Sequence, residues 1–288
     1  MRLLFYFIII INLLFSIICY KRAITFREVI TKAKLCKICY SKNSVFNISK
    51  NKMMNIYDNY FYINDTKTKA FCYIFHNDKI IDICFKGTSN YNDVCINIDM
   101  CLESYINKEI KIHKGFLNKY LSIKSIIFDY VAKIIKNNQI EEICLNGHSS
   151  GGAIASIATL DMTYLYKDKI IKCITFGAPK IGNKKFVEEY NSQVKFSLRI
   201  INKNDIIPYL PPIPLIYNHN HKAFALNDYN HYTTTYDYNH YEDNNNRTNF
   251  YNLRQLLRNV YNYFKTNHGV SKYIKNLSIY NLNEFIHK

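Results

Sequence analysis

Hydrophobic residues in the middle of the chain fall into short apolar runs that are separated by longer stretches with helical spacing. The pattern predicts three helices and three strands in alternation. These are a helix at 116–135, a strand at 143–145, a helix at 153–166, a strand at 170–176, a helix at 184–190 and a strand at 196–201. Strands that alternate with helices form a mostly parallel central sheet with helices on both faces. The sequence therefore predicts an α/β fold.

Weaker patterns precede this region. Residues 26–40 have the spacing of a helix, and the polar stretch that follows to about residue 55 is typical of a loop. Residues 71–75 and 80–85 are apolar and flank a turn-forming tripeptide at 76–78. We expect them to form a hairpin.

After the last predicted strand, the composition changes. Residues 215–250 are crowded with Tyr, Asn and His, which indicates a long surface insertion. Short helical patterns at 253–264 and 271–277 follow it. Because neither an internal repeat nor a Pro-, Gly- or Ser-rich linker interrupts the chain, we expect a single domain over residues 20–288.

The N-terminus carries a separate signal. Arg2 precedes an apolar run over residues 3–18 that only Asn12 interrupts. A positive charge before such a run is typical of a secretory signal peptide, here residues 1–19. The alternative is an uncleaved membrane anchor, because the run nearly reaches the roughly 20 residues that span a bilayer. We therefore expect a secreted protein, with membrane anchoring through residues 3–18 as the alternative.

The cysteine count fits an oxidising compartment. Of nine cysteines, one belongs to the signal and an even set of eight remains, so some disulfide bonds are expected. Cys144 and Cys173 lie inside strand-like apolar runs and are better explained as buried free thiols. Cys36 and Cys39 have no second pair with metal-ligand spacing, so we expect no metal site. Sequons that would suit a secreted protein occur at Asn47, Asn64, Asn246 and Asn276.

Composition narrows the class of protein. A hydrophobic share of 48% with 15% aromatic residues excludes a disordered or collagen-like chain among the 288 residues. The net charge of +16 comes from lysines scattered among Asn, Ile and Tyr, which is typical of solvated faces. An anionic membrane surface is the functional alternative. We expect no nucleic acid partner, because no nucleic-acid motif accompanies the charge.

The most informative segment is 145–156, in which a short apolar strand runs into Gly147-His148-Ser149-Ser150-Gly151 and then into a helix of small residues. This is the context of a nucleophile elbow, a tight turn that presents a serine hydroxyl. Glycines two before and two after the serine let the strand and helix approach closely. Ser149 is therefore the candidate nucleophile.

A serine hydroxyl needs a histidine to accept its proton and an acid to orient that histidine. In this arrangement the acid follows the serine in the chain and lies after a later strand. Asp205 comes directly after the predicted strand at 196–201. It is the candidate acid.

Five blocks of sequence together resemble the class 3 lipases related to fungal secreted triacylglycerol lipases. They occur in the order of that family at residues 85–88, 113–116, 147–153, 175–183 and 199–212. The resemblance covers roughly residues 70 to 215. It implies an α/β-hydrolase fold, hydrolysis of carboxylic esters at a lipid surface, and a serine triad in which Ser149 is the nucleophile and Asp205 the acid.

The histidine of the triad is harder to place. The candidates downstream of Asp205 are His219, His221, His231, His240, His268 and His287. Residues 267–277 look like the C-terminal histidine segment of the family, which favours His268 as the catalytic base. His219 or His221 resembles a non-catalytic histidine that family members carry soon after the acid. His113 is better explained by the packing of its own turn.

The resemblance also implies an oxyanion hole and a lid. The backbone N–H of Ser150 is one expected donor, and Thr88 is the other through its N–H and its hydroxyl. Tyr91, Val94 and Ile98 share one face at helical spacing, as a small amphipathic lid would require. Val94 stands where the family usually has Trp, and Ser150 stands where it commonly has an apolar residue.

These observations predict a secreted serine lipase that hydrolyses esters of the triacylglycerol type at a membrane or droplet surface, without metal or organic cofactor. A phospholipase or a small-ester esterase is the nearest alternative. A catalytically silent, basic lipid-surface-binding protein on the same scaffold is the alternative from another class. We expect no obligate protein partner.

Overall fold

The computed structural model describes residues 24–41, 56–88, 101–213, 216–221, 223–226 and 268–279. The predicted signal at 1–19, the lid residues Tyr91, Val94 and Ile98, most of the insertion at 215–250 and the short helix at 253–264 lie outside the described residues. None of the helices in the described ranges is long and apolar enough to cross a membrane.

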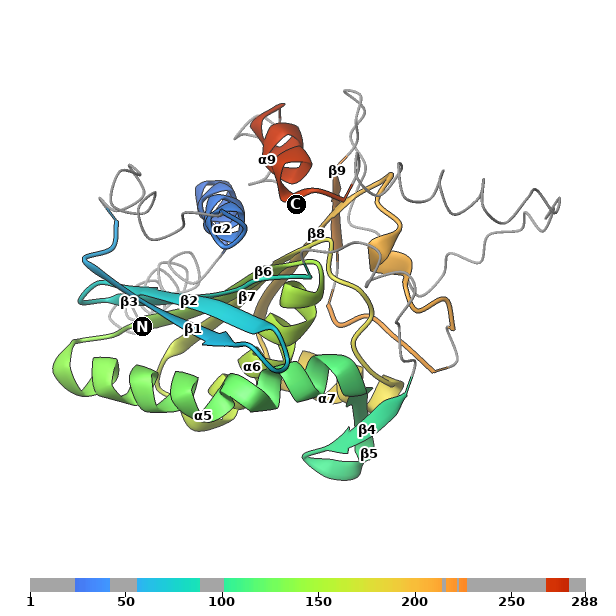
Figure 1. Ribbon diagram of the computed structural model, residues 1–288, viewed down its shortest axis with the longest axis horizontal. Coiled ribbons are helices and arrows are strands. Elements are labelled where there is room, and N and C mark those ends of the chain that lie inside the picture. The colour runs from blue at the N-terminus through green and yellow to red at the C-terminus, as the bar shows by residue number, and fades with distance from the viewer. Residues whose placement is uncertain are drawn as a thin grey trace, which may run out of the picture.

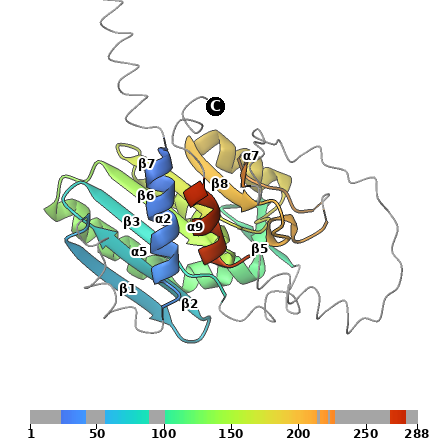
Figure 2. The same ribbon diagram turned by 90° about the horizontal axis from the view of Figure 1, so that it is seen from above.

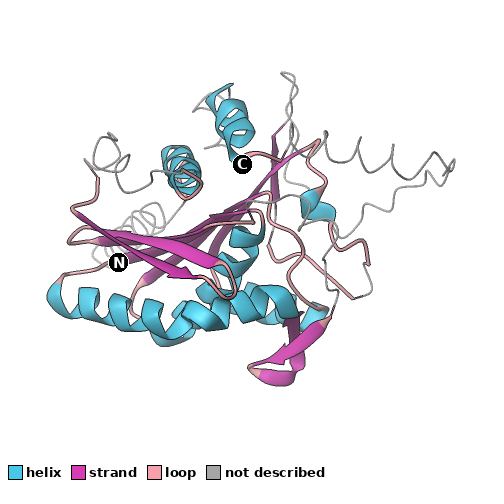
Figure 3. Cartoon of the chain, in the orientation of Figure 1, coloured by secondary structure: helices cyan, strands magenta, loops and turns pink. Residues whose placement is uncertain are grey.

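A seven-stranded sheet forms the centre of the molecule, in the order β1-β2-β3-β6-β7-β8-β9 (Figures 1 and 3). Its strands are β1 (Asn59–Asp65), β2 (Ala70–His76), β3 (Ile80–Phe85), β6 (Glu142–His148), β7 (Ile170–Phe176), β8 (Phe196–Asn202) and β9 (Ala223–Leu226). The pairs from β3 to β9 are parallel, whereas β1, β2 and β3 form an antiparallel meander. The predicted hairpin and the mostly parallel sheet are both confirmed.

Helices cover both faces of this sheet, as predicted. On one face lie α5 (Lys114–Asn137), α6 (Ser150–Leu165) and α7 (Lys184–Gln193), and on the other lie α2 (Phe26–Ile38) and α9 (Val270–Ile279) (Figures 1 and 2). Each face has its own hydrophobic core. A short two-stranded sheet of β4 (Leu102–Tyr105) and β5 (Asn107–His113) precedes α5.

Local sequence explains where the important helices begin. Thr25 and Glu28 form a reciprocal capping box at the start of α2, with each side chain bound to the other residue's backbone N–H. α6 is buried on nearly all sides, because its small residues permit close packing between the sheet and α5. α6 also starts at Ser150, three residues before the predicted start, so the turn that holds Ser149 is tighter than the sequence pattern indicated.

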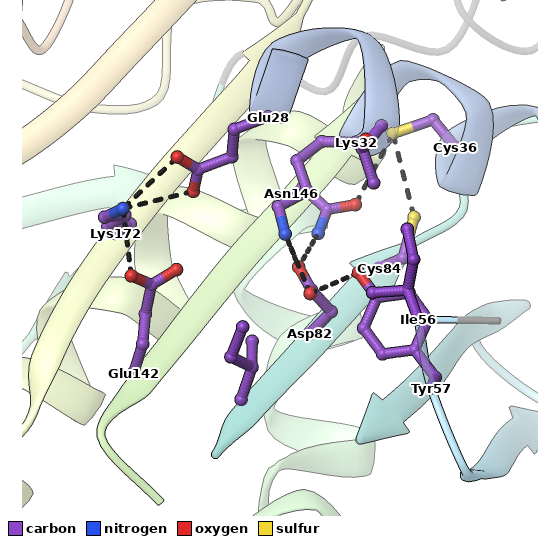
Figure 4. A network of polar contacts seen from close by, with 12 residues as sticks. Glu28, Lys32, Cys36, Ile56, Tyr57, Asp82, Cys84, Glu142, Asn146 and Lys172 are labelled. Atoms are coloured by element: carbon purple, nitrogen blue, oxygen red, sulfur yellow. Dashed lines mark hydrogen bonds and ion pairs between the residues drawn. The ribbon is translucent and has the colours of Figure 1, made fainter. Parts of the chain in front are cut away.

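Charged residues attach α2 to the sheet (Figure 4). Lys32 contacts both carboxylate oxygens of Asp82 on β3, at 2.6 and 2.8 Å, and both side chains are almost completely buried. Tyr57 donates to the same carboxylate at 2.6 Å, and Asn146 of β6 donates to it at 3.3 Å. Because each buried charge has a partner, this polar interface is compatible with a packed core.

The expected disulfides do not occur among the described cysteines. Cys144 and Cys173 are buried free thiols, as the alternative interpretation held. Cys36, Cys39, Cys72 and Cys84 are free thiols as well. In the described part of the chain, α2 is therefore held to the sheet by packing, ion pairs and hydrogen bonds.

Candidate active site

Ser149 occupies a strained turn between β6 and α6. Its φ of 59° and ψ of −134° place a non-glycine residue in a sparsely populated backbone region. The turn is held by the Ser149 N–H, which donates to the Phe176 carbonyl at 2.9 Å, and by the Gly152 N–H, which donates to the Ser149 carbonyl at 2.9 Å. A Cβ at Gly147 would lie 2.3 Å from the carbonyl oxygen of Gly151. The glycine spacing is therefore a steric requirement of the turn.

Asp205 lies in the loop after β8, at the carboxyl end of the parallel strands. Its Oδ2 is 2.6 Å from Nδ1 of His268, the residue that immediately precedes the turn into α9. The Ile207 N–H donates to its other oxygen at 3.0 Å. Asp205 and His268 are both buried. Residues 63 positions apart in the chain thus meet at one edge of the sheet.

Tyr273 holds the same carboxylate and had no assigned role in the sequence prediction. Its hydroxyl accepts a hydrogen bond from the Asn202 N–H at 3.1 Å and donates to Asp205 Oδ2 at 2.6 Å. Burial and the nearby Asp205 carboxylate raise the pKa of Tyr273 well above its usual value, so the hydroxyl stays a donor. In the sequence, the role of Tyr273 was indicated only by its place as an aromatic residue soon after His268.

The other candidate histidines have different partners. Nε2 of His219 contacts the Pro208 carbonyl, and Nε2 of His221 lies 2.7 Å from the Val194 carbonyl. His231, His240 and His287 lie outside the described residues. Nδ1 of His113 accepts from the Gly115 N–H at 3.1 Å, and its ring stacks on Phe116, which agrees with a role in packing its own turn. Among the described candidates, His268 is the one that the fold brings to Asp205.

Thr88 and Ser150, the expected oxyanion donors, lie side by side. Thr88 follows the end of β3, and Ser150 is the first residue of α6. The Thr88 N–H donates to Ser150 Oγ at 3.0 Å, and the two hydroxyl oxygens are 3.1 Å apart. Nζ of Lys119 lies 3.5 Å from the Thr88 hydroxyl. In this conformation the Thr88 N–H therefore points at the Ser150 hydroxyl.

The region around Ser149 is enclosed. Ser149 is 2% exposed and His268 is 0% exposed. The His148 ring packs against the His268 ring with centroids 4.6 Å apart, and a Cβ at Gly87 would lie 3.0 Å from the Ser149 Cβ. In the described conformation, Ser149 is therefore buried, and the segment that carries Thr88 packs close to its side chain.

Sequence reasoning missed two further side chains at this site, Tyr40 and His148. Tyr40 lies just after α2, and its hydroxyl accepts from the Gly87 N–H at 3.0 Å and lies 3.0 Å from His148 Nδ1. Nε2 of His148 lies 2.6 Å from the His268 carbonyl oxygen. These contacts span 47 to 120 positions of sequence, so no local spacing could have indicated them.

Comparison with known proteins finds a similarity over the region that holds this site. Residues 83–215 match the family model described as lipase (class 3). The chain is 26% identical over 157 residues to a secreted mono- and diacylglycerol lipase of Malassezia globosa. This alignment covers 51% of this chain and 52% of that protein. It is 29% identical over 146 residues to a lipase of Rhizopus niveus. That alignment covers 49% of this chain and 37% of the relative. The chain thus spans about half or less of the length of these relatives.

Solved structures agree on the fold. The lipase of Rhizopus microsporus var. chinensis matches 69% of this chain and 74% of its own at 22% identity, with a TM-score of 0.64. The triacylglyceride lipase of Rhizomucor miehei superposes on 69% of this chain and over 79% of its own length, at 20% identity and with a TM-score of 0.64. At this identity the likeness concerns the fold, which is the predicted α/β-hydrolase fold. The family match at residues 83–215 contains the elbow around Ser149 and the loop of Asp205, so over this region the chain is similar to the class 3 lipases.

Proposed function

We propose that this protein is a serine esterase that hydrolyses carboxylic ester bonds of lipids. The observation that carries the proposal is the 2.6 Å contact between Asp205 and His268, made at the same strand edge as the strained turn of Ser149. A buried carboxylate on one imidazole nitrogen fixes the tautomer and leaves the other nitrogen able to accept a proton. The similarity of residues 83–215 to the class 3 lipases supports the same chemistry.

The proposed reaction has two stages. The Ser149 hydroxyl loses its proton to Nε2 of His268 as its oxygen attacks the acyl carbon, and the alcohol leaves with that proton when the ester bond breaks. Water then loses a proton to His268 and attacks the acyl-enzyme, which releases the acid and restores the serine. Asp205 keeps Nδ1 of His268 protonated and stabilises the imidazolium that forms in both stages. Tyr273 and the Ile207 N–H hold the carboxylate in place.

The negative charge on the substrate oxygen needs donors that already point toward it. We assign the N–H of Ser150, at the N-terminus of α6, and the N–H of Thr88. Because the Thr88 N–H is bound to Ser150 Oγ in the structure, that hydroxyl must move aside or be displaced when the oxyanion forms. Loss of either donor should cost on the order of a hundredfold in kcat.

Lipid esters of the triacylglycerol type are the proposed substrates. The names of two Malassezia globosa relatives, secreted mono- and diacylglycerol lipases, support acylglycerol esters as the broader class. Secretion is proposed for the same reason, together with the apolar run at 3–18. A panel of triacylglycerol, diacylglycerol, phospholipid and short soluble esters, assayed with one enzyme preparation, separates a lipase from a phospholipase and from a small-ester esterase.

Ser149→Ala tests the chemistry directly. The variant should lose covalent labelling by a serine-directed phosphonate together with hydrolysis of a short soluble ester. Ser156→Ala is the matched control, because Ser156 is a buried serine nearby in α6 whose hydroxyl donates to the Gly152 carbonyl of its own helix. Hydrolysis that persists in folded Ser149→Ala would refute the assignment. Liposome binding by a wild-type protein without esterase activity would instead identify a catalytically silent surface-binding protein.

A further inference from the structure

A continuous line of hydrogen bonds runs from the segment before Thr88 to the main chain of His268. It starts at the Gly87 N–H, passes through the Tyr40 hydroxyl and the His148 ring, and ends at the His268 carbonyl oxygen. Three parts of the proposed site meet along it. They are the loop after β3 that carries Thr88, the residue before Ser149, and the backbone of the proposed base.

The chemistry of the two ends fixes the direction of every bond. A carbonyl oxygen can only accept a hydrogen bond. Nε2 of His148 must therefore carry a proton and donate a hydrogen bond to the carbonyl oxygen of His268. A neutral imidazole has a single N–H, so Nδ1 of His148 is then an acceptor and the Tyr40 hydroxyl must donate to it. The Gly87 N–H can only donate, so the Tyr40 oxygen accepts from it. The assignments from both ends agree.

The protonation state of His148 is consistent with this direction. Burial, with a smaller contribution from charge on His268, holds the pKa of His148 well below its usual value. The ring therefore stays neutral where the proposed base operates, and it keeps the single N–H that the line requires. A charged His148 would carry a second N–H toward Tyr40 and would also oppose the positive charge that His268 gains in the reaction.

We propose that Tyr40 and His148 are positioning residues that hold the backbone of His268 and the segment Gly87–Thr88 in place relative to Ser149. This inference rests on the proposed esterase function. Tyr40 lies just after the C-terminal end of α2. Its hydroxyl connects this end of the helix to Gly87 after β3 and to His148 at the end of β6. Tyr40 acts through Gly87 and His148, and His148 acts through the backbone and ring of His268.

The positions of these groups affect catalysis more than binding. A proton acceptor or an oxyanion donor displaced by about 1 Å costs on the order of a hundredfold in rate, whereas the ester can still enter the site. The expected signature is therefore a fall in kcat with little change in KM. A residue that merely supports the fold would lower the amount or thermal stability of active protein without this split.

Tyr40→Phe is the main test, because it removes one hydroxyl and keeps a ring of similar shape beside His148. We expect kcat on a soluble ester to fall about 10- to 100-fold, with KM changed less than about twofold. Tyr190→Phe is the matched control. Tyr190 is buried, and its hydroxyl pairs with Ser197 under α7, on the opposite face of the sheet. Its kcat should stay within about twofold of the wild type.

A second variant and a spectroscopic readout keep the test independent of folding. His148→Gln places an amide N–H near the position of Nε2 and should retain more activity than His148→Leu, which has no donor. Nitrogen-15 NMR of histidine-labelled wild-type protein should find His148 as the neutral Nε2–H tautomer from pH 8 to pH 6.

The outcomes separate this inference from the proposed function. If wild type and Tyr40→Phe share the same kcat, or if His148 is found as the Nδ1–H tautomer, the inference is wrong while the esterase assignment stands on Ser149→Ala. If the wild type neither reacts with the phosphonate nor cleaves any ester, the proposed function fails and the inference fails with it.

Discussion

Two buried polar networks lie on the same face of the sheet, and α2 reaches both. The first, the α2 network, lies beneath the helix and pairs full charges (Figure 4). It comprises Glu28, Lys32, Tyr57, Asp82, Glu142, Asn146 and Lys172. The second, the site network, lies past the end of the helix and consists of Tyr40, His148, Asp205, His268 and Tyr273.

Buried polar groups have different roles in the two networks. In the α2 network, Lys32 lies against Asp82. Burial lowers the pKa of Lys32, but the combined effect of Asp82, Cys144 and Tyr57 raises it well above its usual value. Lys32 therefore keeps its charge over the whole physiological pH range. In the site network, Asp205 binds Nδ1 of His268 and leaves its other nitrogen as the proton acceptor of the proposed reaction. We infer that the first network fixes the helix and that the second can take part in proton transfer.

The shared helix explains why the first network matters for the second. Lys32 lies in the middle of α2 and Tyr40 lies just after its C-terminal end, so the position of the Tyr40 hydroxyl depends on how α2 packs on β3 and β6. Removing a group from the α2 network should therefore change stability first, whereas removing one from the site network should change rate first.

The largest expected effect is on rate and comes from Asp205→Asn. The amide cannot stabilise the imidazolium and favours the wrong tautomer of His268, so kcat should fall by about 10⁴-fold. The measurement is kcat on a soluble ester, with urea unfolding alongside. A loss below tenfold in folded protein would remove Asp205 from the proposed triad.

The next effect is on stability. Lys32→Met leaves the buried Asp82 carboxylate without its cation, which should lower the free energy of unfolding by about 3 to 5 kcal/mol. Lys79→Met is the control, because Lys79 and Glu141 form an exposed ion pair whose loss should cost less than about 1 kcal/mol. Denaturant titration measures both. Equal stabilities for the two variants would contradict the contrast between buried and surface pairs.

Acid should destabilise the protein through histidines in and around the site. The pKa values of His148 and His219 are lowered well below 6.5, mainly by burial. Below pH 6.5 the unfolded chain therefore binds protons that the folded chain does not, and stability falls as pH falls. The expected slope is about 1.4 kcal/mol per pH unit for each histidine. Burial lowers the pKa of His221 and His76 as well, which adds to the same trend.

Unfolding in urea at pH 7.5, 6.5 and 5.5 measures this trend. His148→Gln should reduce the slope, because the unfolded chain then has one fewer proton to take up. A free energy of unfolding that stays constant from pH 7.5 to 5.5 would show that these histidines are not held neutral in the folded state.

The smallest effect concerns the Thr88 N–H. Ser150→Ala removes the hydroxyl that this N–H binds in the structure, so the oxyanion no longer competes with it. One neutral hydrogen bond is worth about 1 kcal/mol, which predicts a rise of about fivefold in kcat/KM. A tenfold fall would instead show that the Ser150 hydroxyl itself donates to the oxyanion.

The strands β1, β4, β5 and β9 were not predicted from the sequence, and the reasons are physical. β1 is an edge strand with little buried surface, and β9 is four residues long inside a segment whose composition indicated an insertion. Neither has the long apolar run that marks a central strand. β4 and β5 are mostly exposed and polar, so their pairing also left little trace in the hydrophobic pattern.

The sequence by itself determined what depends on neighbouring residues. The alternation of strand and helix, the glycine-framed turn at Ser149 and the position of Asp205 after a strand all follow from periodicity and local sterics. Only the tertiary structure decided that His268 is the described candidate that meets Asp205, that Tyr273 holds the same carboxylate, and that Tyr40 and His148 join the site. The physical reason is that these hydrogen bonds join residues 63 to 120 positions apart, and only the packing of α2 and α9 on the same sheet brings such residues within bonding distance.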